Sequence, residues 1–152
     1  MLRHTVATLA YRGGKAALGA PEGFASFRIA ENSRTAGQIL AHIGDLLDWA
    51  FWLAKGKHAW KGSAPLPWER EVARFFSALK SFDAYLETDA PLGFPAEKLF
   101  QGPIADALTH VGQLATLRRL AGSPVRGENY FKAEIAVGRI GADQSTVRVE
   151  FD

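Results

Sequence analysis

The chain has 152 residues, 47% of them hydrophobic, and this length and composition suit one domain with a substantial core. The absence of cysteine excludes disulfides, thiolate metal ligands and a cysteine nucleophile, so metal ligands must be His, Asp or Glu. A net charge of +2 without a clustered basic stretch argues against a nucleic-acid partner. The N-terminus has no apolar run of signal-peptide length, and no run is long enough to cross a bilayer. We therefore expect a soluble cytoplasmic protein that does not enter a membrane.

Hydrophobic periodicity predicts two helices in the first half of the chain. The first covers about residues 2–18, although Gly13 and Gly14 weaken its middle because glycine lowers helix propensity. The second begins at Thr35, which forms a capping-box pattern with Gln38, and it ends at a Lys-Gly pair before a loop rich in Gly, Ser and Pro.

Two more helices are predicted in the second half. An apolar stripe over residues 68–87 indicates the third. The fourth begins around Pro103, a residue favoured in the first turn, and stops at Gly122. Four amphipathic helices predict an all-α fold in which about residues 1–122 form a four-helix bundle.

Residues 123–152 are less regular, and we expect them to form a short irregular C-terminal extension of the same domain, so that residues 1–152 are one unit. Asn129 is a candidate cap for a short helix that ends at Ile135. Alternating apolar residues then indicate an extended arm, namely Val147, Val149 and Phe151.

Polar residues on the second and fourth predicted helices form a candidate metal site. Asp106 and His110 are four residues apart, so their side chains lie on one helix face about 6 Å apart. His42 lies at the edge of the apolar stripe of the second helix and can face them. Asp45, one turn further, can hydrogen-bond His42 or replace a ligand, and Gln113 lies just beyond His110. A histidine on an apolar edge is also typical of a hydrogen-bonded core residue, so periodicity alone leaves both interpretations open.

Aromatic and basic residues are candidates for the wall of a pocket around this site. We expect Tyr11, Arg12 and Trp49 to approach a ligand, with the segment around Tyr130 folded over the mouth. Other residues are expected at the surface. His4 and His58 belong to this group, and Arg118 and Arg119 are expected to be solvated or to pair with acidic groups.

The segments around His42 (ILAHIGDLLDW) and His110 (ALTHVGQL) resemble the DinB-like (YfiT-like) metalloenzyme family, and helix order and spacing agree over most of residues 1–122. The resemblance implies an up-up-down-down bundle and one divalent metal ion, commonly nickel or zinc. One ligand would come from the second helix and two from the fourth. Asp106 stands where that family usually has the first histidine of a His-x-x-x-His pair.

Two histidines and a carboxylate leave coordination positions open and suit zinc, nickel, iron(II) or manganese. We expect the ion to activate a thiolate or water for attack on a small electrophile. Family relatives include transferases that use low-molecular-weight thiols, so the resemblance favours S-transfer. Two alternatives stay open: a metal-dependent hydrolase, and a noncatalytic dimeric stress-response binding module. No residue stands out as an obligatory general base.

A homodimer is expected on two grounds. The family resemblance implies one, and the bundle interior has no evident place for several large apolar residues, namely Phe24, Phe27, Phe51 and Trp52.

Overall fold

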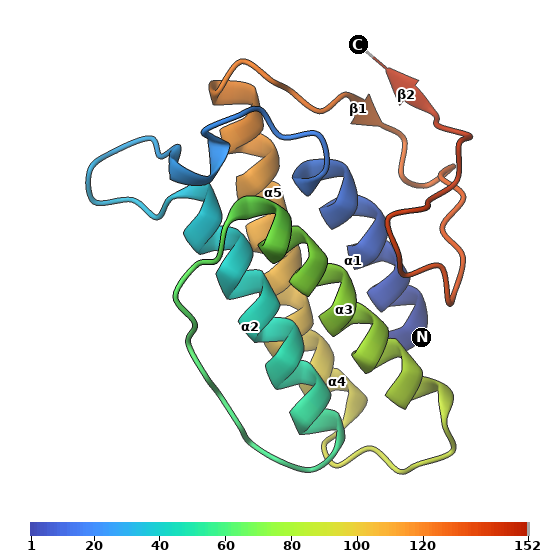
Figure 1. The fold of residues 1–152 in the computed structure, drawn as a ribbon. Helices are drawn as coiled ribbons and strands as arrows, with labels where there is room; N and C mark the ends of the chain where they lie inside the picture. The colour runs from blue at the N-terminus through green and yellow to red at the C-terminus, as the bar shows by residue number, and fades with distance from the viewer. Residues whose placement is uncertain (152) are drawn as a thin grey trace.

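The computed structural model describes residues 1–151, which are mostly helical (Figure 1). Long helices pack side by side, and they are α1 (Leu2–Ala17), α2 (Ala36–Ala54), α3 (Trp68–Glu87) and α5 (Ala105–Leu120). The shorter elements are η1 (Phe24–Ser26), α4 (Ala96–Leu99), η2 (Phe100–Ile104), β1 (Gly127–Glu128) and β2 (Glu150–Phe151). The prediction of a mainly helical chain is therefore confirmed. Among residues 1–151, no helix combines the length and apolar character that crossing a membrane requires.

All four long helices contribute to one hydrophobic core, which includes Leu9 of α1, Ile43 of α2, Phe75 of α3 and Leu114 of α5, each fully buried. The glycine that weakens α1 has a packing role here. A Cβ atom on Gly13 would collide with the ring of Phe75, so glycine at this position allows α1 and α3 to approach closely.

Contacts near the helix ends establish the helix directions. Arg3, at the start of α1, binds Asp83 near the end of α3 at 2.9 Å, so these two helices are antiparallel. The rings of Phe51 and Tyr85, both near the C-terminal ends of α2 and α3, lie 6.2 Å apart, so α2 and α3 are parallel. Since α5 runs alongside α1 in the same direction, the order is up-down-down-up (Figure 1). The expected up-up-down-down order is wrong.

The α2–α3 connection makes this order possible. Residues 55–67 can span up to about 40 Å when extended, whereas the 19 residues of α2 are only about 28 Å long. The connection therefore returns along the length of α2, and α3 starts at the same end as α2 (Figure 1).

The last long helix begins earlier than predicted. Helical backbone continues from Ala96 through α4, η2 and α5 to Leu120, and Pro103 lies inside it instead of starting it. Residues 100–104 form a π-helical turn, a wider ring that accommodates a residue without a backbone N–H. The sequence pattern could not reveal this turn because proline ordinarily ends a helix.

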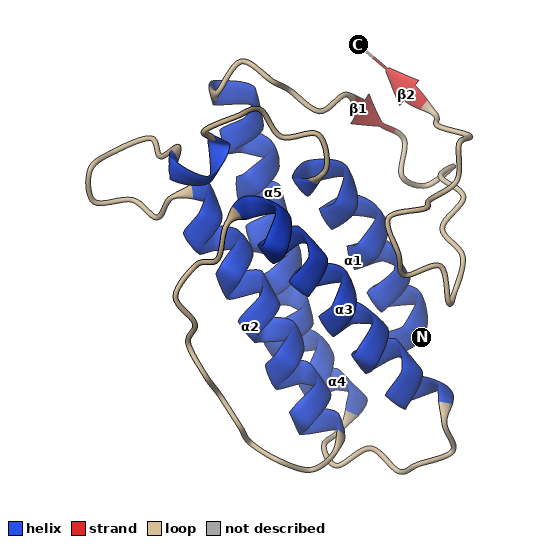
Figure 2. Ribbon diagram, viewed as in Figure 1, coloured by secondary structure: helices blue, strands red, loops and turns tan. Residues whose placement is uncertain are grey.

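The C-terminal extension packs against α1 (Figure 2). Strands β1 and β2 pair antiparallel, in agreement with the extended arm, whereas the short helix predicted from Asn129 is replaced by a turn. The buried carboxylate of Glu128 accepts hydrogen bonds from Tyr11 and, at 2.7 Å, from Lys15. Burial acts to raise the pKa of Glu128, but these two hydrogen bonds, together with the positive charges of Lys15 and Arg148, lower that pKa overall. The extension is thus joined to α1 by a buried ionic contact.

Arg118 is buried at the end of α5, so the prediction that it is solvated or paired with an acid is wrong. Its guanidinium donates hydrogen bonds to backbone carbonyl groups that end α1 and α5, namely those of Ala16, Leu18, Gly19 and Ser123. These carbonyls have no further helical turn to supply donors, so Arg118 caps two helices at once.

We predict that Arg118→Met lowers the free energy of unfolding by about 3 kcal/mol, because it leaves buried carbonyl groups without donors. Urea unfolding followed by circular dichroism measures the change. The neighbouring Arg119→Met is the matched control, since Arg119 is exposed, and we expect a change within about 0.5 kcal/mol. Equal effects of the two substitutions would contradict the capping role.

Candidate metal site

The α2–α5 contact brings His42, Asp106 and His110 together. One potential ligand atom from each residue lies within 4.8 Å of the other two. Asp106 is central, with Oδ2 3.6 Å from Nε2 of His42 and Oδ1 3.5 Å from Nε2 of His110. The two imidazole rings are 4.7 Å apart and nearly perpendicular. This group can hold a metal ion.

These separations fit a small divalent ion. Zinc binds histidine nitrogen at about 2.0–2.1 Å, which places two tetrahedral ligand atoms about 3.3 Å apart. The two measured separations that involve Asp106, 3.5 and 3.6 Å, are close to this value. The side chain of Asp106 is 48% exposed, so the triad is open to solvent on one side. An ion held by three protein ligands there has positions left for a further ligand.

Local sequence features of α2 and α5 position the three candidate ligands. At the start of α2, Thr35 and Gln38 form the predicted capping box, with both reciprocal hydrogen bonds present. His42 then lies two turns into the helix, on the side that faces α5. On α5, the four-residue spacing of Asp106 and His110 places both side chains on one face.

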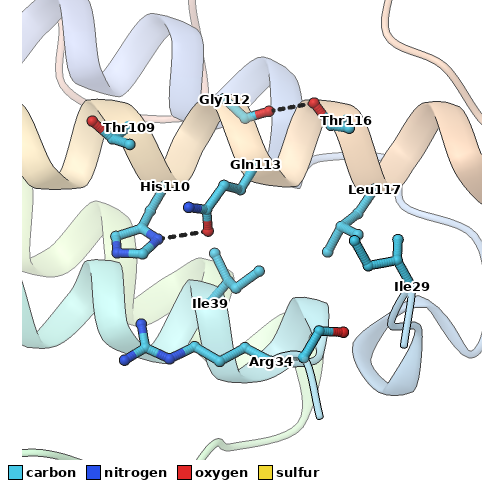
Figure 3. A pocket seen from close by; sticks show the side chains of 10 residues that line it. Ile29, Arg34, Ile39, Thr109, His110, Gly112, Gln113, Thr116 and Leu117 are labelled. Atoms are coloured by element: carbon cyan, nitrogen blue, oxygen red, sulfur yellow. Dashed lines mark hydrogen bonds between the residues drawn. The ribbon is translucent and has the colours of Figure 1, made fainter. Parts of the chain in front are cut away.

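Gln113 determines which nitrogen of His110 faces the triad. Its Oε1 lies 2.8 Å from Nδ1 of His110 (Figure 3). An amide oxygen accepts a hydrogen bond, so Nδ1 carries the proton and the lone pair of Nε2 points toward Asp106. This is the usual arrangement around a metal-binding histidine, in which a neighbouring acceptor fixes the tautomer.

The environment of His42 favours its neutral form. Burial lowers the pKa of His42, and the charges of His110 and Arg34 lower it further, while Asp106 and Asp45 act in the opposite direction. A neutral imidazole keeps the lone pair that a metal ion requires. The ring of Trp60 lies 5.7 Å from that of His42 and covers it from the loop after α2.

Asp45 lies beside the triad with other partners. Its Oδ2 accepts a hydrogen bond of 2.8 Å from the backbone N–H of Ser63, and its Oδ1 pairs with Arg74 of α3. We had expected Asp45 to bond His42 or to act as a ligand. Instead it connects the α2–α3 loop to α2.

The remaining pocket candidates divide into two groups. Trp49 is separated from the site by Trp60. The ring of Trp60 lies 5.6 Å from that of Trp49 and 5.7 Å from that of His42. Tyr11 and Arg12 are directed elsewhere: Tyr11 bonds Glu128, and the guanidinium of Arg12 lies 4.4 Å from the ring centre of Tyr130. The expectation that Tyr11, Arg12 and the Tyr130 segment close the pocket is therefore wrong. They attach the C-terminal extension to α1.

Two cavities flank the triad. One, about 660 Å³, borders His110 and is lined by residues of α2, α5 and the loop before α2 (Figure 3). The other, about 320 Å³, borders His42 and includes Asp45, Trp60 and Ser63 in its wall. Arg34 lines both cavities. Arg34, Ile29 and Trp60 were not predicted as site residues because they come from loops, whose position periodicity does not predict.

Comparison of the chain with known protein families, with curated proteins and with solved structures finds no match. The resemblance to the DinB-like family therefore stays a prediction, and the site is supported by its own geometry.

We predict that the protein binds about one divalent ion per chain and that His42→Ala and His110→Ala each abolish stoichiometric binding. Asp106→Ala should weaken binding, and Asp106→His should restore it, because the imidazole supplies a ligand at the same helical position. Gln113→Leu should weaken it about 10- to 100-fold, since it frees the His110 ring. Elemental analysis and competition with a chelator measure these effects.

The matched control is His4→Ala, because His4 is an exposed histidine on α1. It should leave metal content unchanged. Full metal content and affinity in either His42→Ala or His110→Ala would refute the triad.

Proposed function

We propose that this chain is a divalent-metal-dependent enzyme of the DinB-like type, built on a four-helix bundle, and that it transfers a low-molecular-weight thiol to a small electrophile. The observation that carries the proposal is the convergence of three ligand atoms from α2 and α5 beside a cavity of about 660 Å³. That volume lies within the range of small-molecule sites, about 300–1,000 Å³. The triad takes one residue from α2 and two from α5, the distribution that the resemblance implies, although Asp106 replaces a histidine and the helix order differs from the expected one.

The donor set suits zinc or nickel, with iron(II) and manganese as further candidates. When bound, such an ion supplies a deprotonated thiol or water at neutral pH by lowering its pKa. The side chains of the protein bind and orient this ion. His42, Asp106 and His110 hold the ion, and Gln113 keeps the His110 ring in position.

The two cavities favour transfer over hydrolysis. A hydrolase needs room for one organic substrate, because water occupies little space, whereas a transferase must hold two organic reactants next to each other. Here a cavity borders His110 on one side of the triad and a second borders His42 on the other. Each cavity borders one histidine of the triad, so the two reactants would approach the ion from different sides.

We predict that low-molecular-weight thiols change the visible spectrum of cobalt-substituted protein, because a sulfur donor replaces coordinated water. The metal-loaded protein should then conjugate one of a panel of bacterial thiols to model electrophiles faster than the uncatalysed background. The thiol-dependent absorption change and the conjugation rate are the two measurements.

His110→Ala under the same metal loading is the control for both readouts, and it should reach only the background rate. Absence of a thiol-dependent spectral change, together with equal rates for both proteins, would remove the transferase proposal. Metal-dependent ester or amide hydrolysis by the same samples would then support the hydrolase alternative.

A second proposal concerns assembly. Phe24 is buried within the single chain, contrary to expectation, but Phe27, Phe51 and Trp52 are only partly buried. We predict a homodimer that covers such apolar surface. Light scattering at micromolar concentration should give twice the 16.5 kDa of one chain, and a clean monomer would contradict it.

A further inference from the structure

The larger cavity contains one formal charge apart from its histidine. Among the ten described residues that line it, Arg34 is the single Lys, Arg, Asp or Glu. Arg34 is exposed at the mouth, and its side chain extends toward the His110 end of the cavity in Figure 3. Arg34 also lines the smaller cavity, which borders His42, so it lies where both cavities approach the triad.

The guanidinium of Arg34 makes no hydrogen bond and no salt bridge among residues 1–151, a property that it shares with other exposed arginines such as Arg70. Unlike Arg70, it lines a cavity. A free guanidinium presents several N–H donors in a planar fork that matches a carboxylate with two parallel hydrogen bonds.

The rest of the wall is uncharged. Ile29, Ile39 and Leu117 supply apolar surface, and the neutral polar side chains are those of Ser33, Thr109, Gln113 and Thr116. Ile29 remains 64% exposed in the free chain, so a ligand in the cavity has an apolar surface to cover. One positive charge above an apolar wall is complementary to a molecule with one acidic group and an apolar body.

We propose that the substrate of the larger cavity is a small organic carboxylate, whose apolar body packs on Ile29, Ile39 and Leu117 and whose carboxylate pairs with Arg34. A carboxylate accepts two parallel hydrogen bonds from the planar guanidinium, and its single negative charge matches the one charged side chain of the cavity wall. Pairing at Arg34 would hold the reactive carbon of the substrate near the triad. This inference rests on the proposed function, since it names the electrophile of that reaction.

The test uses phenylacetate and its uncharged analogue phenylacetamide as probes, with binding measured by calorimetry on the full chain. Metal-loaded wild type should bind phenylacetate more tightly than phenylacetamide. Arg34→Gln should weaken phenylacetate binding about tenfold and leave phenylacetamide binding unchanged, while Arg34→Lys should retain part of the preference. Arg70→Gln is the matched control, because Arg70 is an exposed arginine on α3 outside the cavity wall, and it should behave as wild type.

A second arm repeats the measurement after chelation, because a carboxylate could also bind the metal ion directly. Pairing at Arg34 predicts that the preference for phenylacetate survives chelation. Three results would overturn the inference: equal phenylacetate affinity in wild type and Arg34→Gln, equal loss for both probes, or a preference that disappears on chelation. If the chain binds no metal but keeps an Arg34-dependent preference for the carboxylate, the metal-dependent function fails while the anion site stands.

Discussion

The candidate site depends on how α2 is rotated against α5. Packed helices have axes about 8–10 Å apart, so side chains meet between them only where both helices turn the right face inward. Burial of Ile39, Ile43 and Leu46 sets the rotation of α2, and burial of Ala107, Val111 and Leu114 sets that of α5. His42 and His110 lie at the edges of these two stripes, so hydrophobic packing itself brings their rings to 4.7 Å. The geometry of the triad is thus a consequence of the core.

Polar groups in the fold differ in whether their hydrogen-bonding capacity is used. Arg118 donates to the carbonyls at the ends of two helices, and Glu128 accepts from Lys15 and Tyr11, so both serve stability. The triad and Arg34 are different. The Nε2 atoms of the two histidines lie more than 3.4 Å from Asp106, and Arg34 has no partner among the described residues. The triad and Arg34 border the two cavities, so their polar atoms are placed to meet a ligand there.

Local patterns in the sequence predicted the parts of the site that depend on one helix at a time. The capping box at Thr35 and the Asp106–His110 spacing involve neighbours within four residues, and both are present. Long-range contacts were not predictable in this way. The surroundings of Tyr11 and Arg118 were predicted incorrectly, because their partners are about a hundred residues away in sequence. These partners are Glu128 and the end of α1. The helix order that the family resemblance implied was wrong, because the order depends on the path of the α2–α3 loop.

The loop after α2 is held beside the site by a hydrogen bond to Asp45. A second carboxylate one turn from His42 could compete for the ion. It is instead neutralised by Arg74, and its other oxygen binds the N–H of Ser63. This bond holds the loop that carries Trp60 against His42. Gly44 permits the arrangement, because a Cβ atom there would lie 3.0 Å from the Arg74 guanidinium. Asp45 therefore shapes the smaller cavity without joining the ligand set, and its pairing with Arg74 leaves Asp106 as the carboxylate that faces both histidines.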